Sequence, residues 1–103
     1  MTATSVVDMR LGLAGADLLA VAADPIRWTL LQHLTAGESC VCKLQERVPI
    51  AGNLLSYHLK VLRDAGLVTS SRRGRWIDYT LAPDAFDRLR AALPGSKENS
   101  PVT

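Results

Sequence analysis

The stretch over residues 51–81, AGNLLSYHLKVLRDAGLVTSSRRGRWIDYTL, limits the possible folds of this chain more than any other. Leu55, Leu59 and Leu62 recur at i, i+4 and i+7, and this spacing predicts the buried stripe of a helix. Gly66 follows the last apolar turn, where a left-handed residue commonly ends a helix. The opposite stripe of the same helix is polar and cationic, and consists of Asn53, Ser56, Tyr57 and Lys60.

A short basic hairpin is predicted directly after this helix. Val68 begins its first strand, and Arg73-Gly74 marks its tip. On the return strand, alternation predicts a buried face of Ile77, Tyr79 and Leu81, with Trp76 on the opposite face. The basic side chains of the hairpin are Arg72, Arg73 and Arg75. A polar-faced helix beside an arginine-rich hairpin is what a winged helix-turn-helix presents to DNA.

Apolar periodicity predicts three helices before this stretch. The first covers residues 11–23, and the second begins at Asp24-Pro25, an N-cap followed by an N1 proline, and ends near Leu34. The third covers residues 39–48, with Ser39 or Cys40 as its N-cap. A break at residues 49–52 then joins it to the polar-striped helix as a helix-turn-helix unit.

A last helix is predicted after the hairpin. Pro83 is expected at its N1 position, and its apolar stripe consists of Phe86, Leu89, Ala92 and Leu93. The fold class is therefore mainly α with a small β-hairpin, a winged helix-turn-helix in the order α-α-α-α-β-β-α. We expect a flexible N-terminus over residues 1–10, one domain for DNA binding and dimerisation over 11–93, and a disordered tail over 94–103.

Charge and composition narrow the classes of function. Residues 51–81 carry five basic and two acidic side chains, although the whole chain has a net charge of only +2. This concentration fits a nucleic-acid partner, and an ordinary solvated surface is the alternative. The chain has two isolated histidines, no glycine-rich phosphate loop and no paired carboxylates, so we do not expect an enzyme. No apolar run approaches the length of a membrane span, and no secretory signal is evident, which favours a cytoplasmic protein.

Three segments resemble the ArsR/SmtB family of bacterial metal-responsive repressors. ADPIRWTLLQHL at residues 23–34 is similar to the second helix of that family, and LLSYHLKVLRDAGLVTSSRRGRWIDYTL at 54–81 is similar to its recognition helix and wing. ESCVCKL at 38–44 resembles the ELCVCDL box of its arsenite, cadmium and lead sensors. The resemblance implies a homodimer on double-stranded operator DNA, with no membrane partner. It also implies a partly packed His58.

The chain departs from the family pattern at several positions. Ser39 and Lys43 replace the Leu and Asp of the box, and Gln45 stands where some arsenite sensors have a third cysteine. Other members bind zinc, cobalt or nickel through Asp and His on the last helices of the dimer. The last helix here offers Asp84 and Asp87 but no His, so we do not expect that site.

The metal-ligating candidates are Cys40 and Cys42. A reducing compartment favours ligands or redox groups over a structural disulfide. The preferred ligand is a thiophilic ion, arsenite or antimonite, whose binding releases DNA, and no organic cofactor is expected. Residues i and i+2 of an intact helix point about 200° apart. The two sulfurs therefore converge only if the first turn unwinds or Cys40 lies outside the helix, and unwinding would displace the recognition helix.

Several alternatives stay open at the level of sequence. Cadmium or lead could replace arsenite, and thiol oxidation could replace an ion, although the loop closed by such a disulfide is small and strained. A winged-helix module that binds protein is a further alternative. The sequence does not identify the inducer, the third ligand of the cysteine site, the operator, or whether the protein represses or activates.

Overall fold

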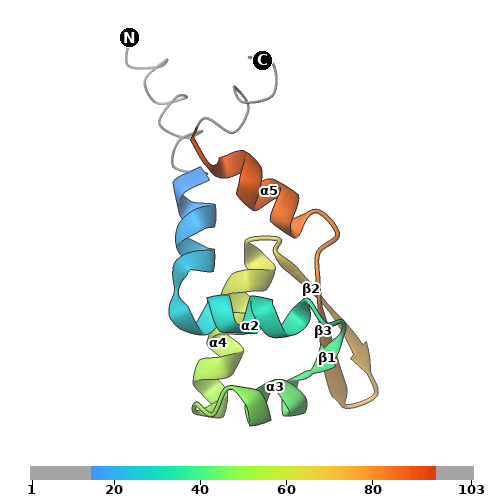
Figure 1. The fold of residues 1–103 in the computed structure, drawn as a ribbon. Coiled ribbons are helices and arrows are strands. Elements are labelled where there is room, and N and C mark those ends of the chain that lie inside the picture. Colours follow the sequence, from blue (N-terminus) through green and yellow to red (C-terminus); the bar gives the residue numbers. More distant parts are fainter. Residues whose placement is uncertain (1–14, 95–103) are drawn as a thin grey trace.

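The computed structural model describes residues 15–94, so the predicted flexible start and residues 95–103 of the predicted tail lie outside it. Helices gather around one core, and a β-hairpin projects from them (Figure 1). The elements in chain order are a helix over residues 15–23, α2 Pro25–Leu34, β1 Ser39–Cys40, α3 Val41–Arg47, α4 Gly52–Asp64, β2 Val68–Arg73, β3 Trp76–Leu81 and α5 Ala85–Ala92.

The predicted winged helix-turn-helix is confirmed, with one strand added. β1 pairs antiparallel with β3, which gives a three-stranded sheet in the order β1-β3-β2. Ser39 lies opposite Tyr79, and Cys40 lies opposite Asp78. Of the two predicted N-caps of the third helix, Cys40 is confirmed, and helical geometry starts at Val41. The predicted start at Ser39 was wrong, because Ser39 pairs with β3.

The predicted start of α2 is confirmed by its capping geometry. The side chain of Asp24 accepts hydrogen bonds from the backbone N–H groups of Ile26 and Arg27, at 2.9 and 3.1 Å. These bonds satisfy two donors that have no partner within the helix. The apolar stripe of α2 then packs into the core through Leu30, Leu31 and Leu34.

The core joins α2, α3 and α4 to the base of the sheet. Its fully buried side chains are mainly leucines, with Val68 from β2. All three leucines of the predicted α4 stripe, Leu55, Leu59 and Leu62, have 0% exposure. Gly66 ends the turn after α4 with a φ of +78°, which a side chain rarely adopts. The core thereby fixes α4 with its polar face outward.

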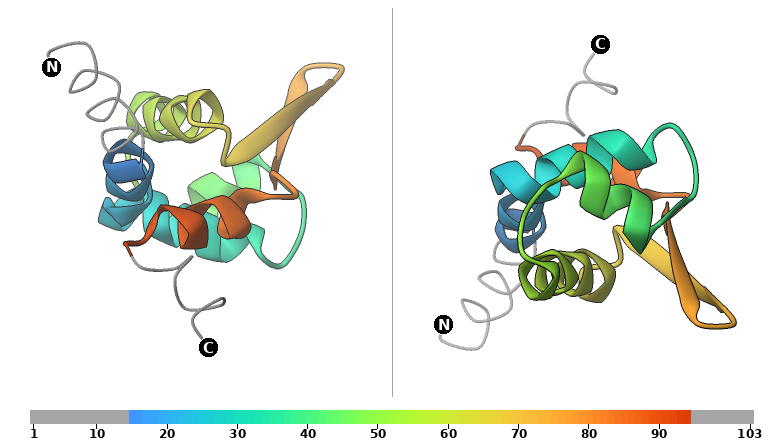
Figure 2. Two further views of the ribbon diagram at one scale, coloured as in Figure 1. Left: turned by 90° about the horizontal axis from the view of Figure 1, so that it is seen from above. Right: turned by 90° about the horizontal axis from the view of Figure 1, so that it is seen from below.

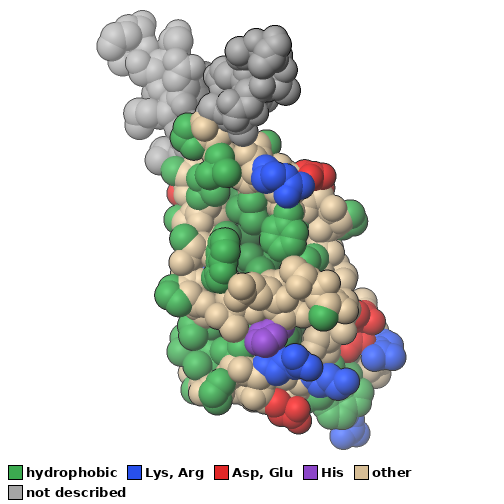
Figure 3. Space-filling model, in the orientation of Figure 1, with side chains coloured by type: hydrophobic (Ala, Val, Ile, Leu, Met, Phe, Trp, Pro, Cys, Tyr) green, Lys and Arg blue, Asp and Glu red, His purple; other side chains and the backbone are tan. Residues whose placement is uncertain are grey.

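The start of α5 differs from the prediction. The helix begins at Ala85 with Asp84 at the N-cap, so Pro83 precedes the helix instead of occupying N1. Two of the four residues of its predicted stripe are not covered within one chain: Phe86 is 38% exposed and Leu93 50%. The space-filling view shows apolar side chains gathered on the face between the helix over residues 15–23 and α5 (Figure 3). In residues 15–94, no helix has the length and apolar character to cross a bilayer.

Candidate nucleic-acid interface and cysteine pair

One face of α4 presents the polar residues that the sequence singled out. Asn53, Ser56, Tyr57 and Lys60 are all exposed, whereas the apolar stripe on the other side of the helix is buried. Tyr57 is 54% exposed. The amino group of Lys60 lies 2.9 Å from Asp64, but both side chains are mostly in solvent, so this ion pair constrains Lys60 weakly. The face is therefore available to a partner.

The β2–β3 hairpin, which we call the wing, carries the second predicted set. Arg72, Arg73 and Arg75 are exposed near its tip, where Gly74 has a φ of +59°. Trp76, predicted on the strand face opposite Ile77 and Tyr79, is 55% exposed. The wing projects away from the helices, and α4 and the wing lie toward the same side in both views of Figure 2.

Asp78 is a site residue that the sequence reasoning missed. Strand alternation placed it on the outer face of β3, yet its exposure is 2%. Arg73 Nε donates a 2.6 Å hydrogen bond to Asp78 Oδ2, and this bond and the carboxylate charge raise the pKa of Arg73. β1 pairs alongside this part of β3, and no local pattern shows a strand of only two residues.

Cys40 and Cys42 form a disulfide in the structure. The sequence favoured ligands or redox groups over a structural disulfide, and it allowed the sulfurs to converge if α3 unwinds or if Cys40 lies outside it. The structure meets the second condition. Cys40 is the N-cap of α3, with extended backbone at φ −80° and ψ 161°, so its side chain can reach Cys42 beside an intact first turn. The Cα atoms are 5.4 Å apart. The backbone N–H of Lys43 donates to Cys40 Sγ at 3.4 Å.

Neither histidine joins the cysteine pair. His58 is 7% exposed and its Nδ1 lies 3.1 Å from Arg27 Nη1, which confirms that it is packed. His33 is half-buried near the end of α2. Within residues 15–94, no cluster of three His, Cys, Asp or Glu side chains could hold a metal ion. An ion at the two cysteines would therefore need a further ligand that this part of the chain does not group with them, such as hydroxide, a small thiol or another side chain.

Sequence comparison places these features in a known group of proteins. A family model described as bacterial regulatory protein, arsR family, matches residues 24–70. The arsenical resistance operon repressor of Bacillus subtilis is 42% identical over 68 residues, which cover 65% of each chain. The transcriptional repressor SmtB of Mycobacterium tuberculosis is 38% identical over 69 residues, which cover 67% of this chain and 51% of the relative. The chain thus spans between about half and two thirds of these curated relatives.

Structural comparison agrees with the sequence match. A crystal structure described as a possible transcriptional regulator for arsenical resistance superposes with a TM-score of 0.70 at 45% identity. The match covers 73% of this chain and 78% of that one. These proteins are named for regulating transcription and not for a reaction that they catalyse. On this sequence and structural similarity, the chain belongs to the arsR family of bacterial regulatory proteins.

Proposed function

We propose that the protein is a DNA-binding transcriptional repressor that is released from its operator by chemistry at Cys40 and Cys42. The observation that carries this proposal is the joint exposure of the polar α4 face and the basic wing on one side of the molecule. A helix enters the major groove, and a basic hairpin beside it reaches the flanking backbone.

The two exposed sets have different tasks in this proposal. Asn53, Ser56, Tyr57 and Lys60 of α4 face base edges in the major groove, where the pattern of donors and acceptors differs for each base pair. Arg72, Arg73 and Arg75 contact phosphates or the minor groove. Phosphate contacts release counterions and make the affinity depend on salt without specifying sequence.

The test begins with operator selection from a random pool of double-stranded DNA. Lys60→Ala and Tyr57→Ala should each lower the preference for the selected operator by about 1–3 kcal/mol, the usual value of a good base contact. Arg75→Ala should weaken binding to every sequence and reduce the salt slope by about 1. Arg90→Ala, an exposed arginine on α5, is the matched control. A change of sequence preference in Arg75→Ala with an unchanged salt slope would refute this division.

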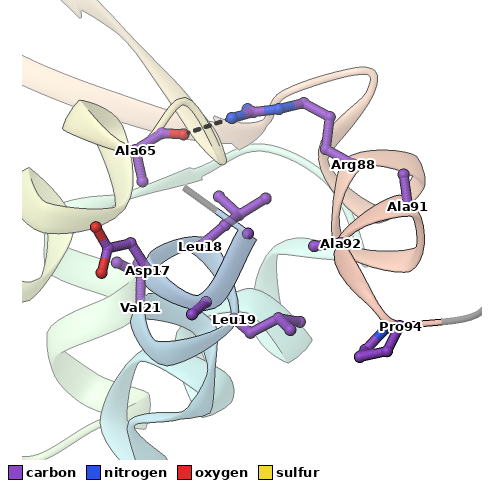
Figure 4. Close-up of a pocket in the computed structure, with 11 residues that line it drawn as sticks. Asp17, Leu18, Leu19, Val21, Ala65, Arg88, Ala91, Ala92 and Pro94 are labelled. Atoms are coloured by element: carbon purple, nitrogen blue, oxygen red, sulfur yellow. Dashed lines mark hydrogen bonds between the residues drawn. The ribbon is translucent and has the colours of Figure 1, made fainter. Parts of the chain in front are cut away.

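The protein is further proposed to act as a homodimer. A hollow of about 760 Å³ lies between the helix over residues 15–23 and α5, and Figure 4 shows Leu18, Leu19 and Ala92 at its border. Together with exposed Phe86 and Leu93, these side chains form an apolar surface on two terminal elements. A second copy would bury this surface and place two α4 helices in successive major grooves, about one helical turn of DNA apart.

Sedimentation at micromolar concentration tests the dimer. The parent should sediment as a dimer, and Phe86→Asp should shift it toward the monomer. Leu54→Asp is the matched control, because Leu54 is similarly exposed at 43% but lies on α4. A monomeric parent, with or without DNA, would contradict the proposal.

Arsenite or antimonite is the proposed inducer, and it binds the reduced pair. Support comes from the geometry, since Cys40 lies outside α3 and its sulfur reaches that of Cys42 without unwinding the helix. Soft thiolates select soft ions, and two of the matched proteins are named for arsenical resistance. Hydroxide or a small thiol would complete the coordination. Cadmium and lead are the competing ions on the same chemistry.

Titration of the reduced protein on its selected operator tests the inducer. Arsenite, antimonite, cadmium, lead, zinc and nickel are compared, and arsenite or antimonite should release DNA at the lowest concentration. To change the ratio of DNA-bound to released protein from 99:1 to 1:99, the ion must favour the released state by about 5.5 kcal/mol. A Cys40→Ser, Cys42→Ser double variant should bind operator yet ignore arsenite. Equal release of that variant and the parent would place the site elsewhere.

Thiol oxidation is a second candidate signal, favoured by the disulfide itself. Two thiols would give two electrons and two protons to a peroxide, forming one S–S bond and leaving two waters. Operator affinity should then differ between the oxidised and the dithiothreitol-reduced protein. If both states bind equally and arsenite still releases the reduced form, the redox candidate fails and the ion remains.

A further inference from the structure

Asp78 occupies the point where the wing meets the cysteine pair. In the sheet it lies opposite Ser71 of β2 on one side and opposite Cys40 of β1 on the other. Its side chain is 2% exposed, and among the described residues only His58 is another buried polar or charged side chain. A buried carboxylate is costly unless a partner compensates its charge. Asp78 therefore depends on the partner that reaches it.

That partner is Arg73, near the tip of the wing. Arg73 Nε donates to Asp78 Oδ2 at 2.6 Å, while the Arg73 side chain stays 74% exposed. The bond uses one of the five N–H donors of the guanidinium and leaves both terminal amino groups available. The buried carboxylate of Asp78 thus fixes the direction of the Arg73 guanidinium, which points to solvent.

The cysteine pair borders the same small space. A cavity of about 140 Å³ is lined by residues from β1, α3, β2 and β3 and by the residue before β1, namely Glu38, Ser39, Cys40, Lys43, Arg73 and Asp78. Cys40 is therefore connected to the ion pair through its backbone pairing with Asp78 and through the shared cavity. The disulfide joins Cys40 in turn to α3.

We propose that Asp78 is a positioning residue that couples the state of the Cys40–Cys42 pair to Arg73 and the wing. The inference rests on the proposed function, in which Arg73 contacts the DNA backbone. A bridge between the two sulfurs ties β1 to the first turn of α3 and so restrains β3, Asp78 and the wing. Without the bridge, β1 keeps its two-residue pairing with β3 and its chain connection to α3 but loses the side-chain link to the first turn, and the wing gains freedom.

Tryptophan fluorescence reports this motion without DNA or an inducer. The chain has two tryptophans, so Trp28→Phe leaves Trp76, the pairing partner of Arg73, as a single probe. In the full chain, the anisotropy decay of Trp76 should show a more restricted wing in the disulfide form than after reduction with dithiothreitol, with a thiol count confirming each state. A Cys40→Ser, Cys42→Ser background should show no response to dithiothreitol.

Variants of Asp78 separate coupling from mere folding. Asp78→Ala should abolish the redox difference in Trp76 anisotropy, and Asp78→Asn, which keeps a neutral acceptor for Arg73, should retain part of it. Asp87→Ala on exposed α5 is the matched control and should respond like the parent. Reduced Asp78→Ala should also bind all DNA sequences about two- to twelvefold more weakly, the usual effect of freeing one rotamer-rich side chain. Even if Asp78→Ala fails to fold, the Asn variant decides the question.

The possible outcomes distinguish this inference from the proposed function. Equal anisotropy in the oxidised and reduced parent, or a full response in Asp78→Asn and Asp78→Ala, would overturn the coupling. Release of DNA by arsenite with an unchanged Trp76 signal would likewise overturn the coupling and leave the proposed inducer intact. A Trp76 response that depends on Asp78, with operator binding indifferent to arsenite and oxidant, would support the coupling and refute the inducer.

Discussion

Arg88 of α5 holds the end of α4 through two hydrogen bonds. Its Nη1 donates to the carbonyl of Gly66 at 2.8 Å, and its Nη2 donates to the carbonyl of Ala65 at 3.0 Å. These carbonyls lie where the partial negative charge at the end of a helix favours a cation. A hydrogen bond from a charged donor contributes about 1.5–3 kcal/mol, and partial solvent screening lowers that value. We therefore predict that Arg88→Ala lowers the free energy of unfolding by about 2–3 kcal/mol.

Urea unfolding followed by circular dichroism measures this loss. Protein concentration is held fixed, because dimerisation would add to the apparent stability. The Tm should fall by at least about 8 °C for a domain of this size. Arg88→Lys keeps the charge but not the planar pair of donors, and should lie between the parent and the Ala variant.

Arg90→Ala supplies the matched control for this prediction. Arg90 lies on the same helix, and its ion pair with Asp87 is exposed on both sides, so its loss should change stability little. If Arg88→Ala unfolds at the same urea concentration as Arg90→Ala, then the two bonds to α4 contribute nothing measurable. That result would refute the argument from the carbonyl contacts.

Three further predictions concern the cap, the core and the wing. Asp24→Ala should cost about 1 kcal/mol at pH 7. Burial raises the pKa of Asp24, but the N–H donors of Arg27 and Ile26 hold it below its usual value, so the cap's contribution should fade as the pH falls below about 4 in urea titrations at several pH values. Leu59→Ala should cost about 2–5 kcal/mol by calorimetry, because Leu59 is fully buried. Gly74→Ala meets no neighbour but strains a φ of +59°, so thermal unfolding should show a loss of about 1 kcal/mol, and no loss would refute the strain.

The sequence was informative where a local signal and the core agreed. Asp24-Pro25 predicted the start of α2 because an N-cap carboxylate acts only on its immediate neighbours. The leucine spacing of α4 predicted its buried face and, by exclusion, the exposed polar face. Gly74 marked the wing tip because the turn requires a positive φ. These predictions needed no knowledge of distant residues.

The errors came from contacts between distant residues. Ser39 has the local character of a helix start, but its pairing with β3 outweighs it and leaves Cys40 as the N-cap. Asp78 was placed on an outer strand face because alternation cannot reveal the neighbouring two-residue strand or the partner, Arg73, that meets it there. Pro83 satisfies the local rule for N1, yet the turn after β3 extends through Asp84 before the helix begins. The role of the cysteines also depended on β1, which holds Cys40 outside α3.

The strand order has a consequence for how the protein survives at high concentration. β3 is central, so β2 leaves a free edge along the wing, and its residues after Val68 are exposed. A long unpaired edge is a template on which another sheet can add strands and begin aggregation. This edge ends in Arg72 and Arg73, whose like charges would repel the same edge of a neighbouring molecule. Bound DNA would neutralise these charges, and dissolved salt would screen them. The edge is therefore best protected against pairing in the DNA-free protein at low ionic strength.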